Sequence, residues 1–427
     1  MKKICILTLG CKVNQYESEA MGQMFPKDKY DVTFEFSPAD AYIINTCSVT
    51  NISDRKSRQM IRKCTKQDNS PFVAVTGCYS HAKPEEATNI EGVNFVLGTE
   101  NKTKLVKVIE EYFGDTDTQI SDRTDGFDFP LVTDYKEKTR AIVKIQDGCN
   151  SFCSYCIIPY VRGRCRSRDP KEIIEEISSL ADNGYKEIVL AGIHVCNYGI
   201  DLDDMTFPKL LSMIEAVPNI ERIRLSSVEP LAFNEEFYEF FKNSKKLCPH
   251  FHISLQSGSD SVIKRMNRHY TGEYFLNTVK RLKSINPNTS VTTDIIVGFP
   301  EETQEEFNET VELAKKAGFL KIHTFKYSKR NGTKAAEMEN QVSETVKDER
   351  SKIIIKLSEM SEKEILSSYV GRTLCVLFEE EKKGYMHGFS ENYIPVFVLG
   401  GNELKGKIKN VKIERIDGLS AIGKIIE

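Results

Sequence analysis

Short apolar runs alternate with helical patterns along most of the chain, and this alternation constrains the fold more than any other feature. In the first part of the chain, strand-type runs are followed by helix-type stretches, the strands at 4–9, 41–45 and 72–76 and the helices at 16–25, 53–66 and 102–113. Strands that alternate with helices predict a parallel sheet with helices on its faces. We therefore expect an open parallel α/β domain over residues 1–113.

The alternation restarts at Ala141 and continues to about residue 342. The candidate strands are 141–145, 187–190, 222–225, 252–255, 292–297 and 321–325. Helical patterns lie between them, including 170–183, 233–243, 272–284 and 302–317. Six successive strand–helix units predict a partial (βα)6 barrel, two units short of the eightfold barrel.

The remaining segments differ in pattern from these two domains. Residues 114–140 are polar, acidic and rich in turn formers, which indicates a linker. Residues 343–368 are typical of one long charged helix, which we expect to connect two domains. From residue 369 to 427 short strands with glycines predict a small all-β barrel. The expected fold class is therefore α/β with a C-terminal all-β domain.

Composition limits the location and the partners of the chain. No apolar run approaches the ~18 residues of a membrane-spanning helix, so we expect no membrane partner. The apolar run after Lys3 is shorter than the ~7–15 residues of a signal-peptide core. We therefore expect a cytoplasmic protein, in which clustered cysteines indicate metal binding or catalysis more often than disulfides. The net charge of −3 means that any nucleic-acid-binding surface must be local.

Three of the twelve cysteines stand close together, at Cys149, Cys153 and Cys156. They follow the first strand of the predicted barrel, and the carboxyl ends of barrel strands carry active sites. A structural zinc site usually takes a fourth ligand close in sequence, whereas the next cysteine here is Cys165. An iron–sulfur cluster can be held by three cysteines and keep one iron open. We expect a 4Fe-4S cluster; a zinc knuckle or a chance spacing are the alternatives.

A second set of cysteines has no local spacing but shares a position relative to the strands. Cys11, Cys47 and Cys78 each follow a predicted strand of the first domain after one intervening residue. The carboxyl ends of parallel strands point to one edge of an open sheet, where ligands bind. A single such cysteine is usually a small buried hydrophobic residue. Three at equivalent places predict a second metal cluster.

The C-x3-C-x2-C spacing, with an aromatic residue before the last cysteine, resembles the radical S-adenosylmethionine (SAM) superfamily. With the second cysteine set, the chain resembles the methylthiotransferases of that superfamily over essentially its whole length. The matching stretches are Leu9–Gln15 (LGCKVNQ), Asn45–Thr50 (NTCSVT), His252–Ser259 (HISLQSGS) and Asp294–Pro300 (DIIVGFP). The family usually has glycine after that last Phe-Pro, where this chain has Glu301.

The resemblance implies an N-terminal domain with an auxiliary 4Fe-4S cluster, a radical SAM barrel and a C-terminal TRAM barrel. It implies two 4Fe-4S clusters and SAM as cofactors, with SAM serving as both methyl donor and radical source. The runs 10–15, 54–59, 192–194 and 198–199 look most like the branch that converts threonylcarbamoyladenosine at tRNA position 37 into its 2-methylthio derivative. The alternatives are the branch acting on isopentenyladenosine and the one modifying an aspartate of a ribosomal protein. An iron–sulfur electron carrier is an alternative of another class.

By the same resemblance, SAM lies over the strand ends of the barrel. The positions expected to contact it are Gly192, His194, Ser226, Gln256 and Gly298. His194 could equally be a hydrogen-bonded loop histidine, and Ser254 and Gln256 are expected on one face of a strand. An electron donor such as a flavodoxin or ferredoxin is expected as a partner.

Two basic runs beside the cysteines predict contacts with the tRNA anticodon loop. On a helix, Arg55, Arg58 and Arg62 fall on one face. A second run follows the barrel cysteines and contains Arg162, Arg164, Arg166 and Arg168. Charge runs are usually just solvated faces, but two of them next to two cluster sites favour phosphate binding. The other cysteines, at 5, 64, 165, 196, 248 and 375, match no ligand pattern and are expected to be structural, although Cys196 lies close to the expected SAM site.

Overall fold

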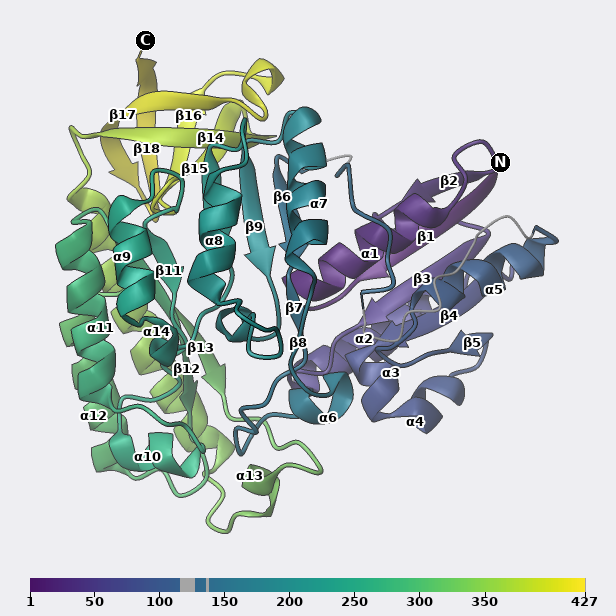
Figure 1. Ribbon diagram of the computed structural model, residues 1–427. Helices are drawn as coiled ribbons and strands as arrows, with labels where there is room; N and C mark the ends of the chain where they lie inside the picture. The colour runs from purple at the N-terminus through teal and green to yellow at the C-terminus, as the bar shows by residue number, and fades with distance from the viewer. Residues whose placement is uncertain (116–126, 136–137, 427) are drawn as a thin grey trace.

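The computed structural model describes residues 1–115, 127–135 and 138–426 (Figure 1). Its N-terminal part is a five-stranded parallel sheet in the order β2-β1-β3-β4-β5. The strands are β1 (Lys2–Thr8), β2 (Tyr30–Thr33), β3 (Ala41–Thr46), β4 (Phe72–Gly77) and β5 (Phe95–Val96). The helices are α1 (Lys12–Met24), α2 (Asn51–Thr65), α3 (Cys78–Ala82), α4 (Pro84–Thr88) and α5 (Thr103–Phe113). The predicted open parallel sheet is confirmed; its short edge strands β2 and β5 had no clear pattern.

Helices cover both faces of this sheet, which explains why its central strands are apolar over most of their length. Every residue of β3 and β4 is buried. Ile43 belongs to the core on one face, and its neighbours Tyr42 and Ile44 belong to the core on the other. Strands covered on both faces lose the alternation of polar and apolar residues that a half-exposed strand shows.

The central part is an open six-stranded arrangement of parallel strands, which confirms the predicted partial barrel. It contains β6 (Arg140–Lys144), β9 (Glu187–Ala191), β10 (Arg222–Leu225), β11 (His250–His252), β12 (Ser290–Val297) and β13 (Lys321–Lys326). Isolated bridges next to β10 and β11, including the one between Ile223 and Leu247, connect its two halves. The longer helices around it are α7 (Pro170–Asp182), α8 (Phe207–Glu215), α9 (Glu235–Asn243), α11 (Gly272–Ile285) and α12 (Gln304–Ala317). Shorter elements are β7 (Gln146–Asp147), α6 (Ile158–Arg162), β8 (Arg166–Ser167), α10 (Asp260–Arg265) and α13 (Lys334–Glu337).

One loop of the barrel differs from the sequence-based expectation, and another explains where this chain departs from the family pattern. The fourth strand ends at His252, and Gln256 has a φ of 65°, so Ser254 and Gln256 do not alternate on a regular strand as expected. The backbone N–H of Gln256 nevertheless donates to the carbonyl of Asp294 (2.8 Å) and keeps the loop on the sheet. Glu301 has a φ of 65°, a left-handed conformation that favours glycine, which explains the family's usual residue at this place.

A long helix leads to the C-terminal domain. α14 (Glu344–Ser367) is followed by a closed barrel in the order β14-β15-β16-β18-β17, which confirms the predicted small all-β barrel. Its strands are β14 (Thr373–Lys382), β15 (Tyr385–Ser390), β16 (Pro395–Leu399), β17 (Ile408–Asp417) and β18 (Ser420–Ile426). This barrel covers the amino ends of the central strands (Figure 1): Arg140 at the start of β6 pairs with Glu379 at 2.6 Å, and Arg222 at the start of β10 donates to the carbonyl of Cys375 at 2.8 Å.

The segment predicted as a linker, 114–140, falls partly outside the described residues. Of its described part, Phe127, Val132 and Tyr135 are buried, so this stretch packs into the core rather than crossing solvent. Among the helices of the described residues, none combines the length and the apolar character needed to cross a membrane.

Candidate active site

The cysteines of the N-terminal domain lie at the carboxyl ends of three neighbouring strands. Strand register pairs Thr8 of β1 with Asn45 of β3, and Thr46 of β3 with Gly77 of β4, so the three strands end at one edge. Cys47 and Cys78 directly follow these strand ends and therefore lie side by side. Gly10 approaches so closely that a side chain at this position would reach within 2.8 Å of the sulfur of Cys47. This contact places the Cys11 loop beside the other two cysteines.

The environment of these thiols opposes their ionisation while they are not bound to a cation. Burial raises the pKa of Cys47 to about 11, and the negative charges of Cys78 and Cys11 add to the rise. Burial also raises the pKa of Cys78, although the positive charge of Arg162 lowers it in part. Iron binding replaces the proton of a thiol by a cation, so the same crowding of sulfur ligands suits a metal cluster.

The second triplet lies on the loop that follows β6 and β7. Gly148 has a φ of 70°, and a Cβ there would lie 1.9 Å from the carbonyl oxygen of Arg164, so only glycine fits this turn. The N–H of Cys156 donates to the carbonyl of Cys153 at 3.0 Å, which folds the loop back on itself. Burial raises the pKa of Cys156 to about 12, and the charges of Cys153 and Cys149 act in the same direction.

Arg268 is a cation beside this triplet that the sequence analysis missed. Its guanidinium lies 3.6 Å from the sulfur of Cys153 and opposes the rise in the pKa of that thiol that burial causes. It also pairs with Glu229 and donates to the carbonyl of Ser254 at 3.1 Å. No sequence motif singled it out, since it stands alone in a loop more than 100 residues after the cysteines.

Each triplet offers three thiols, a donor set that fits a 4Fe-4S cluster. Within the described parts of the chain, no three His, Cys, Asp or Glu side chains gather tightly enough to hold one ion. In a 4Fe-4S cluster each cysteine binds a different iron, so the sulfurs stand farther apart than around one ion. The donors are thiols alone in each set, as iron–sulfur clusters require.

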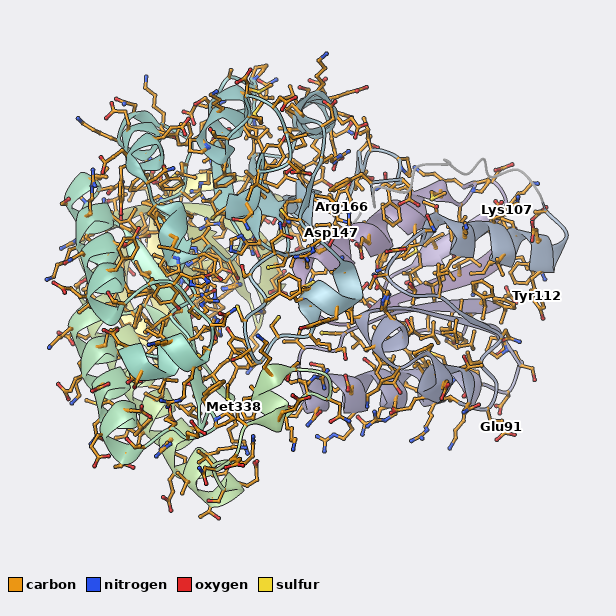
Figure 2. All side chains as sticks on the ribbon, turned by 60° about the horizontal axis from the view of Figure 1, so that its bottom comes forward. Glu91, Lys107, Tyr112, Asp147, Arg166 and Met338 are labelled. Carbon is orange, nitrogen blue, oxygen red and sulfur yellow. The ribbon has the colours of Figure 1, made fainter. Side chains whose placement is uncertain are left out.

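A buried network of charges joins the N-terminal domain to the barrel between the two triplets. Glu17 of α1 accepts from Lys102 (2.5 Å), Lys144 (2.9 Å) and Arg162 (3.0 Å), and Asp147 also pairs with Lys144 (2.7 Å) and Arg162 (3.0 Å). All five side chains are buried. Figure 2 shows Asp147 at this junction, next to its strand partner Arg166. The positive charges of Arg162 and Lys102 act on Cys78 from this network.

Two of the arginines predicted to bind RNA belong to the protein interior, which corrects that prediction. Arg162 is 2% exposed and is held by Glu17, Asp147 and Asn14. Arg168 is 3% exposed and pairs with Glu176 at 2.6 Å. Neither guanidinium is available to a phosphate, because each neutralises buried carboxylates. The sequence shows a run of arginines but not which of them point inward.

The other predicted arginines lie at or near the surface. Arg164 is exposed and lies over the ring of Phe152, and Arg166 is half-buried and donates to backbone carbonyls. On α2, Arg55 and Arg62 are exposed, and Arg58 is half-buried beside Glu86 at 3.6 Å. These five keep their place as candidates for RNA contact.

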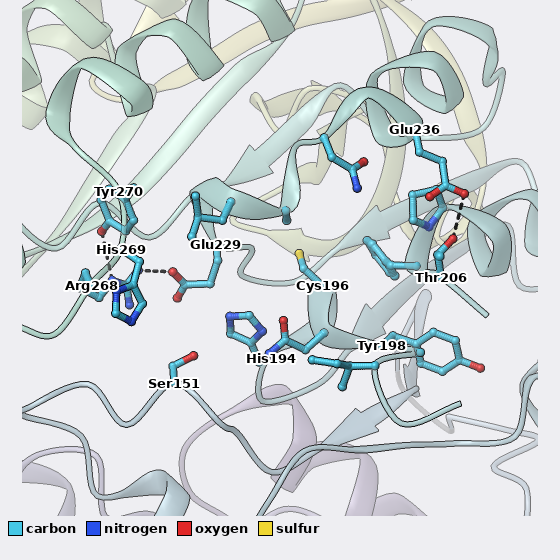
Figure 3. A pocket seen from close by; sticks show the side chains of 18 of the residues that line it. Ser151, His194, Cys196, Tyr198, Thr206, Glu229, Glu236, Arg268, His269 and Tyr270 are labelled. Atoms are coloured by element: carbon cyan, nitrogen blue, oxygen red, sulfur yellow. Dashed lines mark hydrogen bonds and ion pairs between the residues drawn. The ribbon is translucent and has the colours of Figure 1, made fainter. Parts of the chain in front are cut away.

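A cavity of about 410 Å³ opens beside the barrel triplet (Figure 3). Cys153, His194, Glu229 and Arg268 line it, together with Cys196. Burial lowers the pKa of His194, so this ring is neutral near neutral pH. The backbone N–H of His194 donates to the side chain of Gln146 at 2.8 Å, and a side chain on Gly192 would reach the same oxygen.

A second cavity, of about 830 Å³, occupies the inside of the central barrel. We call this cavity the chamber. All three parts of the molecule line it: Gly10 and Lys12 on either side of Cys11, Ser226 and His250 from the central barrel, and Tyr393 from the C-terminal barrel. The hydroxyl of Ser226 is buried and has no hydrogen-bond partner among the described residues. The chamber therefore connects a strand end of the barrel with the cysteine edge of the N-terminal domain.

The two remaining positions expected to contact SAM, Gly298 and Gln256, have left-handed backbone conformations. Gly298 has a φ of 69° and its N–H donates to Glu302 at 2.7 Å, and a side chain there would meet Lys347 at 2.3 Å. Gln256 is half-buried in its left-handed loop. All five positions follow central strands: Gly192 and His194 follow β9, Ser226 follows β10, and Gln256 and Gly298 follow β11 and β12.

Known families and relatives match the three parts of the chain. Residues 3–98 match "Uncharacterized protein family UPF0004", residues 143–314 the radical SAM superfamily, and residues 367–426 the TRAM domain. The threonylcarbamoyladenosine tRNA methylthiotransferase MtaB of Bacillus subtilis is 44% identical over 97% of this chain and 94% of its own length. The tRNA-2-methylthio-N(6)-dimethylallyladenosine synthase of Lachnoclostridium phytofermentans is 38% identical over 99% of this chain and 95% of its own.

Among solved structures, the radical SAM methyltransferase TsrM from Kitasatospora setae superposes with a TM-score of 0.56 at 14% identity, covering 79% of this chain and 77% of that one. This likeness concerns the fold alone. The matches to the curated relatives extend over nearly the full length of this chain and of theirs. The chain therefore belongs to the methylthiotransferase family of radical SAM enzymes.

Proposed function

We propose that this enzyme converts threonylcarbamoyladenosine at position 37 of tRNA into its 2-methylthio derivative. The observation that carries the proposal is the chamber, because it adjoins the Cys11 loop, reaches a strand end of the SAM barrel and is lined by polar and cationic side chains. The threonylcarbamoyl group is polar and bears a carboxylate, whereas a dimethylallyl group is apolar. Relatives named for the first substrate are among the most similar to this chain, which also supports the proposal.

We propose that the chain holds two 4Fe-4S clusters. Cys149, Cys153 and Cys156 would bind the cluster to which SAM attaches, within residues 141–342. Cys11, Cys47 and Cys78 would bind the auxiliary cluster, within residues 1–113. When bound, the two clusters and SAM supply the radical and the sulfur that is methylated and transferred.

The chain's own residues would position these groups. Gly192, His194, Ser226, Gln256 and Gly298 are the proposed contacts for SAM at the ends of the central strands. The positive charges of Arg268 beside Cys153 and of Arg162 beside Cys78 would stabilise the anionic sulfur ligands of the two clusters. The base would enter the chamber from an anticodon loop, since RNA bases are read most readily in single-stranded loops.

The proposed partners are the tRNA anticodon loop and a low-potential electron donor such as a flavodoxin or ferredoxin. We place the reaction in the cytoplasm, and all twelve cysteines are free of disulfides, which agrees with a reducing compartment. The C-terminal barrel, residues 369–427, and the exposed arginines of α2 would hold the RNA.

The test compares two substrates on one enzyme preparation. Anaerobically reconstituted protein is given SAM, a reductant and anticodon stem-loops that differ only in threonylcarbamoyl or dimethylallyl on the target adenosine. Nucleoside mass spectrometry should detect the methylthio product with the first RNA and not with the second. Product from the dimethylallyl RNA alone would contradict the proposed substrate and assign the chain to the other branch.

A further inference from the structure

Among the described residues that line the chamber, one lysine, Lys12, is exposed and has no carboxylate partner. Four lysines and arginines line the chamber in the described parts of the chain. Three of them have carboxylate partners: Arg224 with Glu187 at 2.6 Å, Arg140 with Glu379 at 2.6 Å, and Lys321 with Glu362 at 3.9 Å. Lys12 has neither a hydrogen-bond nor an ion-pair partner among the described residues, and it is the residue next to Cys11.

The two carboxylates that line the chamber in the described residues are also engaged. Asp294 pairs with the Nε2 atom of His252 at 3.2 Å, and His252 bonds the hydroxyl of Thr292 through its other nitrogen at 3.0 Å. Glu362, the other lining carboxylate, pairs with Lys321. The chamber can therefore take up an anionic group, and Lys12 is the cation available to pair with it.

Three aromatic rings form one wall of the same chamber. His250, Tyr393 and Phe389 stack in sequence, with ring centres 4.5 Å apart in each step and planes within 14°. Arg224 lies over the ring of Tyr393 at 4.9 Å. Each face of the Tyr393 ring is covered by a neighbour in this stack, so the rings form an ordered wall, and the buried hydroxyl of Ser226 offers a polar contact at another wall.

We propose that Lys12 is a specificity-determining residue that pairs with the carboxylate of the threonylcarbamoyl group on the target adenosine. This inference rests on the proposed function and extends it to the residue that recognises the substrate. The reacting C-2 carbon and the C-6 carbon that carries the substituted amine belong to the same six-membered ring, so a base held beside Cys11 carries its substituent into the same chamber. An apolar substituent there would leave Lys12 desolvated and unpaired, which excludes the competing substrate as well as favouring the correct one.

Substitution of Lys12 tests this role through binding. We would measure dissociation constants for two anticodon stem-loops of one sequence, with threonylcarbamoyladenosine or plain adenosine at position 37. In Lys12→Met the preference of the parent for the modified RNA should fall roughly 10- to 100-fold, as loss of a hydrogen bond to a charged group implies. Lys12→Arg should restore most of the preference. Lys104→Met, at an exposed position of α5 that does not line the chamber, should leave it unchanged.

The other outcomes contradict the proposal in distinguishable ways. If Lys12→Met weakened both RNAs by the same factor, Lys12 would bind a backbone phosphate and not the substituent. If the preference stayed at the parental value, Lys12 would have no role in selection. If the parent enzyme bound both RNAs equally, there would be no preference in binding for Lys12 to determine, and the proposal would be wrong. Product formation on the threonylcarbamoyl RNA, measured on the same preparation, tests the proposed function separately from the role of Lys12.

Iron content gives a further readout, because Lys12 adjoins a proposed cluster ligand. Iron and sulfide per chain in Lys12→Met should equal those of the parent. The opposite result has two parts: both Lys12→Met and Lys12→Arg lose iron, and the iron-loaded fraction keeps the parental preference. That result would assign Lys12 to cluster binding and overturn its role in recognition.

Discussion

Glu17 of α1 and Arg162 of α6 form an ion pair at 3.0 Å between two separate domains, with both side chains 1% exposed. Glu17 has two further cationic partners, Lys102 and Lys144. Burial alone would raise the pKa of Glu17, but these positive charges outweigh it and hold the pKa well below its usual range. Glu17 is therefore one of the buried carboxylates that set the relative position of the two cysteine sets.

Removing that carboxylate should destabilise the protein strongly. Glu17→Gln leaves three buried cations with only Asp147 between them, and breaking a buried ion pair from one side typically costs about 3–5 kcal/mol. We expect a loss of this size in the free energy of unfolding, measured by urea denaturation under anaerobic conditions. Glu111→Gln is the control, because Glu111 makes an exposed pair with Lys107 at 3.9 Å and its loss should change stability by less than about 0.5 kcal/mol. Equal losses in both variants would contradict the importance of the network.

The second carboxylate of the network predicts a pH window. Burial would raise the pKa of Asp147, but Arg162 and Lys144 lower it from 3.8 to about 2. Because the folded pKa lies below the unfolded one, the unfolded chain takes up the proton first on acidification. The stabilisation by this group is complete above about pH 4 and is lost as the pH falls towards 2. In Asp147→Asn, the slope of unfolding free energy against pH in this window should be smaller by up to about 1.4 kcal/mol per pH unit. An unchanged slope would show that Asp147 does not titrate with folding.

Strand–helix alternation predicted the fold because burial on both faces makes strands such as β3 apolar over most of their length. The cysteine edge was also visible in the sequence, since parallel strands end together. The charge network was not, because Glu17, Lys102 and Lys144 are far apart in the chain and each resembles a surface residue. Burial of Arg162 and Arg168 was missed for the same reason: a run of charges does not reveal which side chains meet a carboxylate inside.

The two cysteine sets should bind iron independently. Replacing Cys149, Cys153 and Cys156 by alanine should remove half of the iron and all cleavage of SAM. Replacing Cys11, Cys47 and Cys78 by alanine should also remove half of the iron, yet uncoupled cleavage of SAM to 5′-deoxyadenosine should persist. Iron and sulfide analysis with product chromatography checks both. Full iron content in the second triple variant would contradict the auxiliary cluster.

Gly77 should be essential for the auxiliary set and dispensable for the other. Its φ is 103°, and a Cβ there would lie 2.4 Å from the carbonyl oxygen of Thr46, so Gly77→Ala must shift β4 against β3 and Cys78 with it. We expect a loss of up to half of the iron, with uncoupled SAM cleavage kept. Gly184→Ala is the matched control, because Gly184 has a φ of 90° but open space around it. That variant should lose only about 1–2 kcal/mol of stability from the left-handed backbone. Iron loss in both variants would mean that general destabilisation, not the position of Cys78, empties the site.

The exposed arginines of α2 should bind RNA phosphate. Neutralising Arg55, Arg58 and Arg62 together should weaken tRNA binding and reduce the slope of log affinity against log salt by about one unit per lost contact at most. Iron content and tRNA-independent SAM cleavage should not change, because α2 contributes no ligand cysteine.

The control for this face is the double variant of Lys104 and Lys107 on α5, where Lys104 is exposed and Lys107 lies at the far side of the N-terminal domain from the junction with the barrel (Figure 2). Lys102 precedes the same helix but is unsuitable, because it is buried against Glu17. Affinities over a salt series for the parent and the two variants decide the matter. If all three proteins gave the same slope, the arginines of α2 would be solvated surface, and Arg164 and Arg166 would be the remaining candidates from the sequence. A smaller slope in the α2 variant alone would place the anticodon arm on the side of the N-terminal domain where Cys47 precedes this helix.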